Sequence, residues 1–410
     1  MQKKKLLIIA GWAPYPLCFG GNQAVFNAVD SLRKDLDIFY IYPGNKVETQ
    51  GENYQVLNKL WENVTILPYM KPSNTSNRYL FFKKVYKRLC SYFLKDNVDY
   101  KLDQELKEEL ECLDEGFLVH IHDVIKKYNI DIVQTEFNQA LSLVNTMPDN
   151  VKKVFVHHEI RFVRNELLLK KFGKENSFLY RYKVEEMKTR EIALLNKYDT
   201  IITLSKNDKE KLESAGVSTL IVPSFAIVQD KYTFKIPNKN TNIITFVGPE
   251  EHIPNKMGVE WFINNCLGSL RKKEPTIEFR IIGNWSETTV KKYSSQPYIH
   301  FCGFVDDLQA TLQNTVMIVP IMIGSGIRMK ILEAASMGVP FVTTTVGVEG
   351  IPFVNGEECI IADTPNEFVN GILKMCDTKN SLLFTQKAFK KYKSLYSLES
   401  LKQSRKSVYE

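Results

Sequence analysis

A glycine-rich loop followed by two basic residues has the residue types and spacing best suited to chemistry in this sequence. Gly324, Ser325 and Gly326 follow an apolar run, and Arg328 and Lys330 come shortly after them. Glycine lets the backbone approach a ligand closely, and the free amides at the start of a helix attract an anion. Cations in a first helical turn oppose the helix dipole, so their presence here indicates an anionic ligand. Phosphate fits best, because Arg can bind two phosphate oxygens at once.

Glu333 follows the same loop and has two possible roles. The pattern predicts a helix that begins near Ile327, and Glu333 lies inside it, three residues after Lys330. Its carboxylate could accept hydrogen bonds from two vicinal hydroxyls, as on a ribose. It could equally pair with Lys330 or Arg328 in a structural network. The spacing alone supports both interpretations.

Two further groups of polar residues follow predicted strands in the first half of the chain. His157 and His158 follow the apolar residues 154–156, and Glu136 follows residues 130–133. Ligands of open α/β sheets bind at such strand ends. Neighbours on a strand point opposite ways, and we expect His157 to face the site because it continues the apolar strand. Either histidine could instead cap the next helix, and Glu136 could be a surface residue.

The elements that must position these residues are short apolar strands that alternate with longer stretches of helical period. This alternation predicts α/β architecture with parallel sheets. A polar stretch, residues 229–242, is typical of an interdomain linker. We therefore predict two doubly wound domains, residues 1–230 and 240–384. The predicted strands are residues 6–10, 38–42, 130–133, 154–156, 200–204, 243–247, 278–282, 298–301, 316–321, 341–344 and 359–362.

The composition is that of a soluble globular protein. Hydrophobic residues make up 44% and charged residues 25% of the 410, which excludes disordered and fibrous classes. No run reaches the ~18 apolar residues of a membrane span. The net charge of +7 suits an anionic partner, but no nucleic-acid recognition motif is present, so we expect no nucleic acid. Seven scattered cysteines without metal-ligand spacing favour a reducing cytoplasm and no metal site.

One segment is unlike its surroundings. From Arg78 to Lys95 the chain carries six basic and six aromatic residues and no acidic one. Residues 96–115, which follow, are strongly acidic, and a hairpin of two helices with complementary charge would explain both segments. The functional alternative is a surface that meets an anionic membrane or a polyprenyl-linked acceptor.

Several short motifs occur in a specific order. Neither glycine-rich region spells G-x-G-x-x-G, which disfavours a nicotinamide dehydrogenase. Instead the chain has G-G at Gly20 and Gly21 after the first predicted strand, F-V-G at 246–248, G-F-V-D-D at 303–307 and G-S-G-I-R-M-K-I-L-E-A at 324–334. This series resembles glycosyltransferase family 4, also called group 1. The resemblance covers nearly the whole chain, most strongly in its second half.

The resemblance implies the GT-B fold, with two Rossmann-like doubly wound domains facing across a cleft. In this fold the C-terminal helix, here residues 385–410, returns to complete the first domain. Residues 1–230 would then face the acceptor, and residues 240–384 would bind the nucleotide sugar.

The resemblance also implies a retaining transferase that takes a sugar from a nucleoside diphosphate sugar, without metal or cofactor. The family's ribose-binding Glu matches Glu333, while the other Glu of that motif falls on Ser325. The loop amides must therefore supply contacts to the sugar. Pro249 replaces a family Arg, and Lys256 stands near the family's phosphate-binding Lys. The donor-binding residues implied are Gly20, Gly21, Gly248, Lys256, Gly324, Ser325, Gly326, Ile327 and Glu333.

For the reaction itself, the resemblance places His157 close to the transferred sugar. Arg328 and Lys330 would stabilise the charge that grows on the leaving diphosphate. Glu136 and His158 would touch the acceptor, a glycan or a polyprenyl-linked lipid of bacterial surface polysaccharide biosynthesis. We expect a cytoplasmic protein, in contact with the inner face of the cell membrane if residues 78–95 bind lipid.

Two alternatives stay open at the level of the sequence. A GT-B sugar-nucleotide epimerase or phosphorylase would use the same donor site without a glycan or lipid acceptor. A non-catalytic subunit that binds nucleotide sugars is the other alternative, because Ser325 and Pro249 replace family residues.

Overall fold

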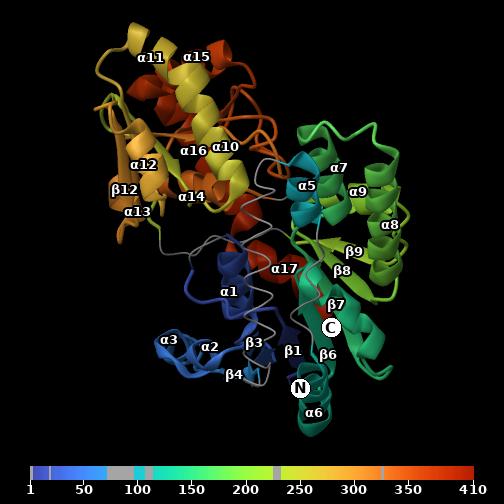
Figure 1. Cartoon of the computed structure of the whole chain (residues 1–410). Helices are drawn as coiled ribbons and strands as arrows, with labels where there is room; N and C mark the ends of the chain where they lie inside the picture. The colour runs from blue at the N-terminus through green and yellow to red at the C-terminus, as the bar shows by residue number, and fades with distance from the viewer. Residues whose placement is uncertain (1–2, 18–19, 72–96, 107–113, 225–231, 325–326) are drawn as a thin grey trace. The chain divides into compact units, whose positions relative to one another are not determined.

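The computed structural model describes residues 3–17, 20–71, 97–106, 114–224, 232–324 and 327–410 (Figure 1). The chain divides into two compact units. The amino-terminal unit comprises residues 1–18, 29–223 and 405–410, and the carboxy-terminal unit comprises residues 19–28 and 224–404. Residues 78–95, for which we considered a helix hairpin and a membrane-binding surface as alternatives, lie outside the described part of the chain.

The amino-terminal unit is built on a seven-stranded parallel sheet of order β4-β2-β1-β6-β7-β8-β9. The order reverses between β1 and β6, and in such sheets ligands bind outside the carboxyl ends of the strands at that point. The strands are β1 (Lys5–Ile9), β2 (Asp37–Ile41), β4 (Val64–Ile66), β6 (Ile132–Glu136), β7 (Lys152–His157), β8 (Thr200–Thr203) and β9 (Leu220–Pro223), and β3 (Pro43–Gly44) pairs with β5 (Tyr69–Met70) beside them.

Helices pack on this sheet through apolar faces. Leu7 and Ile9, two residues apart on β1, share one core with Phe117 and Ile121 of α6. Phe155 of β7 lies in a second core with residues of α8 and α9. The helices are α1 (Gly20–Leu32), which spans the boundary between the units, α2 (Lys46–Gln50), α3 (Glu52–Leu60), α5 (Val98–Leu106), α6 (Glu115–Tyr128), α7 (Arg161–Lys171), α8 (Phe178–Leu195) and α9 (Lys206–Ser214), with the 3-10 segment η1 (Asn138–Thr146).

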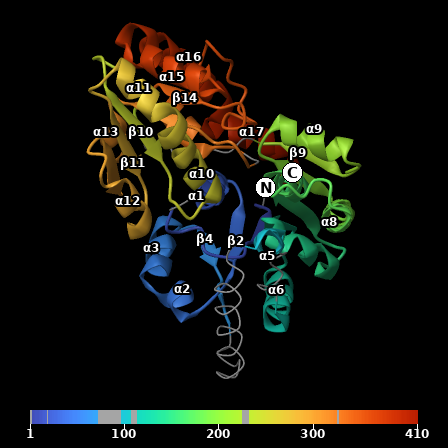
Figure 2. The ribbon, with the colours of Figure 1, turned by 45° about the horizontal axis from the view of Figure 1, so that its top comes forward.

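The carboxy-terminal unit is built on a six-stranded parallel sheet of order β12-β11-β10-β13-β14-β15 (Figure 2). Its order reverses between β10 and β13, which marks the point where a ligand is expected. The strands are β10 (Ile243–Val247), β11 (Glu278–Ile282), β12 (Ile299–Gly303), β13 (Val316–Val319), β14 (Phe341–Thr343) and β15 (Ile360–Ile361).

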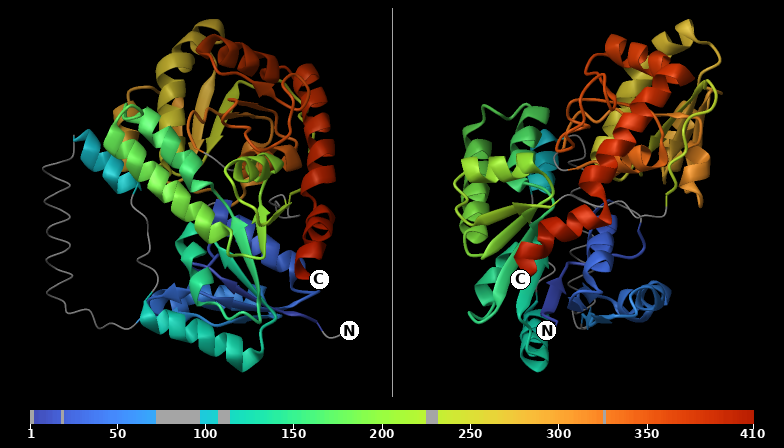
Figure 3. Two further views of the ribbon diagram at one scale, coloured as in Figure 1. Left: turned by 90° about the vertical axis from the view of Figure 1, so that its right-hand side faces the viewer. Right: turned by 180° about the vertical axis from the view of Figure 1, so that it is seen from behind.

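Helices cover this second sheet (Figure 3). The helix α14 packs against α16, while α15 packs against α11 and η2. The elements are α10 (Ile253–Phe262), η2 (Ile263–Leu267), α11 (Gly268–Lys273), α12 (Glu287–Tyr293), α13 (Leu308–Leu312), α14 (Met329–Met337), α15 (Pro365–Cys376), α16 (Thr378–Tyr396) and α17 (Leu398–Tyr409).

The structure confirms the predicted α/β class with two parallel sheets. Every apolar run that we predicted as a strand overlaps one, because a strand buried on both faces needs apolar residues throughout. Residues 232–242 of the predicted linker contain neither helix nor strand. No helix among the described residues is both long enough and apolar enough to span a bilayer.

Candidate functional site

The switch point of the carboxy-terminal sheet brings together residues from two loops. Gly248 follows β10 directly, and the loop that contains Gly324 follows β13 and leads into α14. Arg328 and Lys330 stand at the start of that helix. Ser325 and Gly326 lie outside the described residues. The fold therefore collects most of the predicted donor-binding residues where ligands of such sheets bind.

The backbone at Gly248 lies so close to the side chains of Asn255 and Lys330 that only glycine fits there. Its φ is +148°, and a Cβ there would lie 2.5 Å from Asn255 Nδ2 and 2.9 Å from Lys330 Nζ. Gly283 on the adjacent strand end has a φ of +128°, and its Cβ would lie 2.6 Å from the Gly248 carbonyl oxygen. The backbone after β10 thus passes directly against the Lys330 ammonium group.

Lys330 is half-buried as a residue, but its ammonium group points inward. Nζ donates a hydrogen bond to Asn255 Oδ1 at 2.9 Å and lies 4.3 Å from the centre of the Phe246 ring. The pKa of Lys330 is lowered to about 7, mainly by burial and also by the charge of Arg328, while the charge of Glu333 opposes the shift. A second negative group, such as a diphosphate, would raise this pKa again.

Arg328 precedes the helix rather than lying within it. We predicted a helix start near Ile327, but α14 begins at Met329 and Arg328 is its N-cap residue, with φ −88° and ψ 93°. Its guanidinium is buried, and Nη2 lies 3.1 Å from the position that a Cβ of Gly324 would take. Gly324 has a φ of +117°, so its lack of a side chain lets the loop pass against this cation.

Glu333 is buried on α14 and hydrogen-bonded to Tyr232. Burial, followed by the charge of Glu333 and this hydrogen bond, raises the pKa of Tyr232 well above its ordinary value. Glu333 also acts on Lys330 through its charge. It therefore lies with the basic residues of the site, where it could still face a ribose, and Tyr232 joins them from a distant part of the chain.

Lys256 lies on α10 and is engaged by a carboxylate. Its Nζ contacts Glu250 Oε1 at 2.7 Å. Glu250 also accepts hydrogen bonds from Ser286 N and Thr289 Oγ1, each at 2.7 Å. Burial alone would raise the pKa of Glu250, but these donors lower it to about 2. A phosphate ligand for Lys256 would have to compete with this ion pair.

Gly20 and Gly21 begin α1. The residues around them belong to the carboxy-terminal unit. A Cβ at Gly20 would lie 3.2 Å from Met329 Cγ, at the first position of α14. Glycine therefore allows the start of α1 to approach the start of α14, beside Arg328.

The switch point of the amino-terminal sheet carries a stack of three rings. Trp12, after β1, stacks on Phe137, after β6, with 4.5 Å between ring centres. Phe137 stacks in turn on His158, after β7, with 4.0 Å between ring centres. Phe137 has a φ of +65°, which is rare for a bulky residue and is characteristic of functional sites.

Glu136 is the buried partner of His158. Its Oε2 lies 2.6 Å from His158 Nε2, and its Oε1 accepts a hydrogen bond from Gln134 Nε2 at 2.6 Å. Gln134 Oε1 accepts in turn from the Tyr409 hydroxyl at 2.5 Å. With 2% of its surface exposed, Glu136 is not the surface residue that we considered as an alternative.

His157 points to a different place. Its ring is buried, and Nε2 lies 3.1 Å from Glu191 Oε1. Glu191 also accepts hydrogen bonds from the amides of Arg161 and Phe162 at the start of α7. The structure thus binds His157 into a helix-capping network, and it is His158, rather than the expected His157, that joins the ring stack at the strand ends.

Several of these residues were not found from the sequence. Trp12, Phe137, Asn255, Tyr232 and Glu191 all reach the sites across long separations in the chain. The only available signal was the position of Trp12 and Phe137 directly after predicted strands, where ligands bind in this type of sheet.

A curated relative has a similar length. The chain is 22% identical over 386 residues to an "uncharacterized 44.6 kDa protein in cps region" of Klebsiella pneumoniae, which covers 90% of each chain.

Solved structures share the fold along the whole chain. Anabaena Alr3699/HepE in complex with UDP and glucose is 12% identical with a TM-score of 0.64, covering 98% of each chain. S. aureus TarM is 12% identical with a TM-score of 0.70, covering 100% of this chain and 99% of its own. Sucrose-phosphate synthase from Thermosynechococcus elongatus is 13% identical with a TM-score of 0.72, covering 99% of this chain and 98% of its own.

The family comparison falls on the unit that contains the basic site. Residues 241–378 match the model of the family described as glycosyl transferases group 1. The chain therefore has the GT-B fold and carries a group 1 glycosyltransferase domain over residues 241–378.

Proposed function

We propose that the chain is a retaining glycosyltransferase of family 4 that moves a sugar from a nucleoside diphosphate sugar to a glycan or lipid-linked acceptor. The observation that carries this proposal is the group of cations at the β10–β13 switch point. There the Lys330 ammonium lies against the Gly248 backbone, and Arg328 is buried at the start of α14. The group 1 glycosyltransferase domain over the same residues supports it.

The nucleoside diphosphate sugar would bind at this site. The diphosphate would meet Arg328, Lys330 and the free amides at the start of α14. Glu333 would accept hydrogen bonds from the ribose, and the loop from Gly324 to Ile327 would lie along the sugar. UDP is the first nucleotide to test, because a structural neighbour, Anabaena Alr3699/HepE, was solved in complex with UDP, with UDP and glucose, and with UDP-glucose.

The chemical step follows from the same charges. Negative charge grows on the diphosphate as the bond to the sugar breaks. Fixed cations that are already in place stabilise that charge without reorganisation. The pKa of Lys330, which burial lowers to about 7, would rise as the diphosphate becomes more negative, and this would favour the charged ammonium form in the transition state. We propose that these side chains replace a metal ion, and that no cofactor takes part.

The acceptor side of the proposal rests on the amino-terminal switch point. Because His157 is bound to Glu191, we place His158 next to the acceptor and the reacting sugar. Glu136 holds the Nε2 side of the His158 ring, and the Phe137 ring lies against its face. Aromatic rings offer an apolar surface to the C–H groups of a sugar. The cps region named for the Klebsiella relative supports a role in surface polysaccharide biosynthesis.

A product analysis tests the reaction class. We would incubate the protein with UDP-glucose and EDTA, with and without an acceptor, and follow the anomeric protons by NMR. Transfer, or slow hydrolysis, that gives a product of α configuration is expected. A β-configured product would contradict retention, and dependence on added divalent cation would contradict metal-independent catalysis. A new nucleotide sugar formed without acceptor would indicate an epimerase, and sugar 1-phosphate formed with orthophosphate would indicate a phosphorylase.

A further inference from the structure

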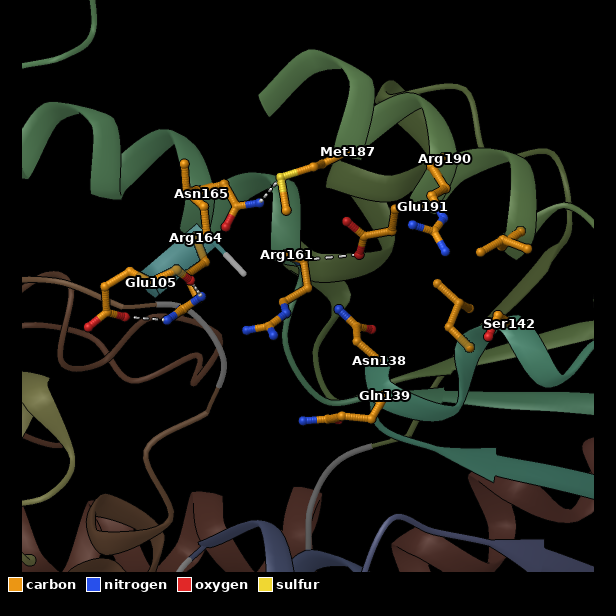
Figure 4. A pocket seen from close by; sticks show the side chains of 13 residues that line it. Glu105, Asn138, Gln139, Ser142, Arg161, Arg164, Asn165, Met187, Arg190 and Glu191 are labelled. Carbon is orange, nitrogen blue, oxygen red and sulfur yellow. Dashed lines mark hydrogen bonds and ion pairs between the residues drawn. The ribbon is translucent and has the colours of Figure 1, made fainter. Parts of the chain in front are cut away.

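A cavity of about 60 Å³ lies in the amino-terminal unit and has no role in the function proposed above. It is formed by α5, α7, α8 and the segment η1, which begins directly after Phe137 (Figure 4). Because Phe137 belongs to the ring stack at the strand ends, the cavity adjoins the place proposed for the acceptor. Nine of its thirteen lining residues are polar or charged, among them Arg161, Arg164, Arg190, Asn138, Asn165 and Glu191.

The charges around the cavity favour an anion. Three arginines line it against two glutamates, Glu105 and Glu191. Glu105 forms an ion pair with Arg164, with 2.8 Å between Glu105 Oε2 and Arg164 Nη2. Both carboxylate oxygens of Glu191 are already engaged, one by His157 and the amide of Arg161 and the other by the amide of Phe162, at the start of α7. Arg161 has a long contact, 3.7 Å, with Glu159, so its guanidinium can still donate to an oxygen at hydrogen-bond distance.

A buried amide points to the same chemistry. Asn165 is only 3% exposed, and its Nδ2 donates to the Met187 sulfur at 3.7 Å. A thioether is a weak acceptor, and a buried polar group with a poor partner is costly. An oxygen placed between Asn165 and the arginines would satisfy this donor. Figure 4 shows Asn165 and Met187 on one side of the cavity and Asn138 on the other.

The volume limits what can enter. A water molecule needs roughly 10–15 Å³ of such space, so the cavity holds about four to six water-sized groups. One phosphate or one carboxylate fits within this volume.

We propose that this cavity binds an oxyanionic group of the acceptor, through Arg161, Arg190 and Asn165. The inference rests on the proposed glycosyl transfer, and it adds that the acceptor is negatively charged near the hydroxyl that is glycosylated. The oxyanion has two possible sources, the phosphate of a phosphorylated acceptor or the carboxylate of an acidic sugar. Both present oxygens that guanidinium groups bind in pairs.

The test is a calorimetric titration of the full chain with inorganic phosphate, glucuronate and glucose, with UDP at saturation to fill the donor site. Phosphate or glucuronate is expected to bind and glucose is not. Arg161→Gln and Arg190→Gln should each weaken that binding roughly tenfold to a hundredfold, as expected for a lost charged hydrogen bond. Arg181→Gln, on the exposed side of α8, is the matched control and should change nothing. Tighter phosphate binding identifies a phosphorylated acceptor, and tighter glucuronate binding identifies an acidic glycan.

The inference is overturned if neither oxyanion binds, or if both bind the Arg161→Gln and Arg190→Gln variants as well as the native protein. The UDP titration that precedes the experiment keeps the two proposals separate. If UDP binds and the oxyanions do not, the acceptor inference fails while the donor site stands. If UDP fails to bind, the donor proposal fails, and the comparison between the variants and the control still decides the cavity's role.

Discussion

At the scale of single residues, the proposed donor site depends on the protonation of Lys330. Burial lowers the pKa of Lys330 to about 7, and a bound diphosphate would raise it. Binding of UDP should therefore take up protons above pH 7, and affinity should fall as the pH rises from 7 to 9. Calorimetry in buffers of different ionisation enthalpy measures this uptake directly. In Lys330→Arg the cation stays protonated, so proton uptake should disappear. Proton uptake that persists in this variant would show that another group titrates.

Gly248 is the backbone position that passes closest to Lys330 of the proposed donor site. Gly248→Ala places a Cβ at a φ of +148° and within 2.9 Å of Lys330 Nζ. We expect a loss of about 1–3 kcal/mol in unfolding free energy, the cost of holding a residue in a sparsely populated backbone region, together with weaker UDP binding. Urea unfolding measures the first effect. The control is Gly268→Ala in α11, where the backbone is helical and no atom lies within 4 Å of the added Cβ. That change should stabilise by about 0.4–1 kcal/mol, and an equal loss at both positions would contradict the steric argument.

At the scale of elements, one carboxylate joins β7 to two helices. Glu191 of α8 accepts from His157 at the end of β7 and from two amides at the start of α7. Glu191→Gln removes the negative charge and one acceptor oxygen. We expect unfolding free energy to fall by about 1–3 kcal/mol, because at least one buried donor loses its partner. Glu185→Gln, exposed on the same helix, should be neutral in the same urea titration. A neutral Glu191→Gln would show that this network does not hold the helix start.

The strands and helices were predicted from the sequence better than the side-chain contacts between distant residues. The strands were predictable because parallel strands buried on both faces need continuous apolar runs, such as residues 6–10 and 316–321. The helix after the glycine-rich loop was predictable from its local pattern, although α14 begins at Met329 rather than near Ile327. Tyr232 on Glu333, and Trp12 on Phe137, depend on how distant segments meet. No local sequence pattern determines which distant segments pack against each other. The same limit applied to His157 and His158, whose directions are set by Glu191 and Glu136.

At the scale of the whole molecule, the end of the chain belongs to the amino-terminal unit. Residues 405–410 join that unit, and Tyr409 is buried there with its hydroxyl on Gln134, in the chain of hydrogen bonds that reaches His158. The carboxyl end thus helps to hold the proposed acceptor side in place, although the segment before it belongs to the other unit.

The basic and aromatic residues 78–95 lead to a prediction about the whole protein. We propose that they meet an anionic membrane surface. The protein should then sediment with phosphatidylglycerol vesicles at low salt and not with phosphatidylcholine vesicles, because basic segments bind anionic headgroups through charge. Binding should weaken as salt rises. Replacement of Lys83, Lys84 and Lys87 by Gln should reduce it, and the exposed Lys387, Lys390 and Lys393 replaced by Gln provide a control of equal charge change. Equal binding to both vesicle types would contradict the proposal.

The most direct test of the donor site is a calorimetric titration with UDP, GDP, ADP and CMP in EDTA, on the native protein and on Glu333→Gln. We predict that UDP binds without metal and that Glu333→Gln loses most of this affinity. Its melting temperature should stay nearly unchanged, because a glutamine oxygen can still accept from Tyr232. Glu357→Gln, exposed on the surface, is the control. Failure of every nucleotide to bind, or a loss of stability in Glu333→Gln with affinity intact, would contradict the donor site and assign Glu333 to a structural network.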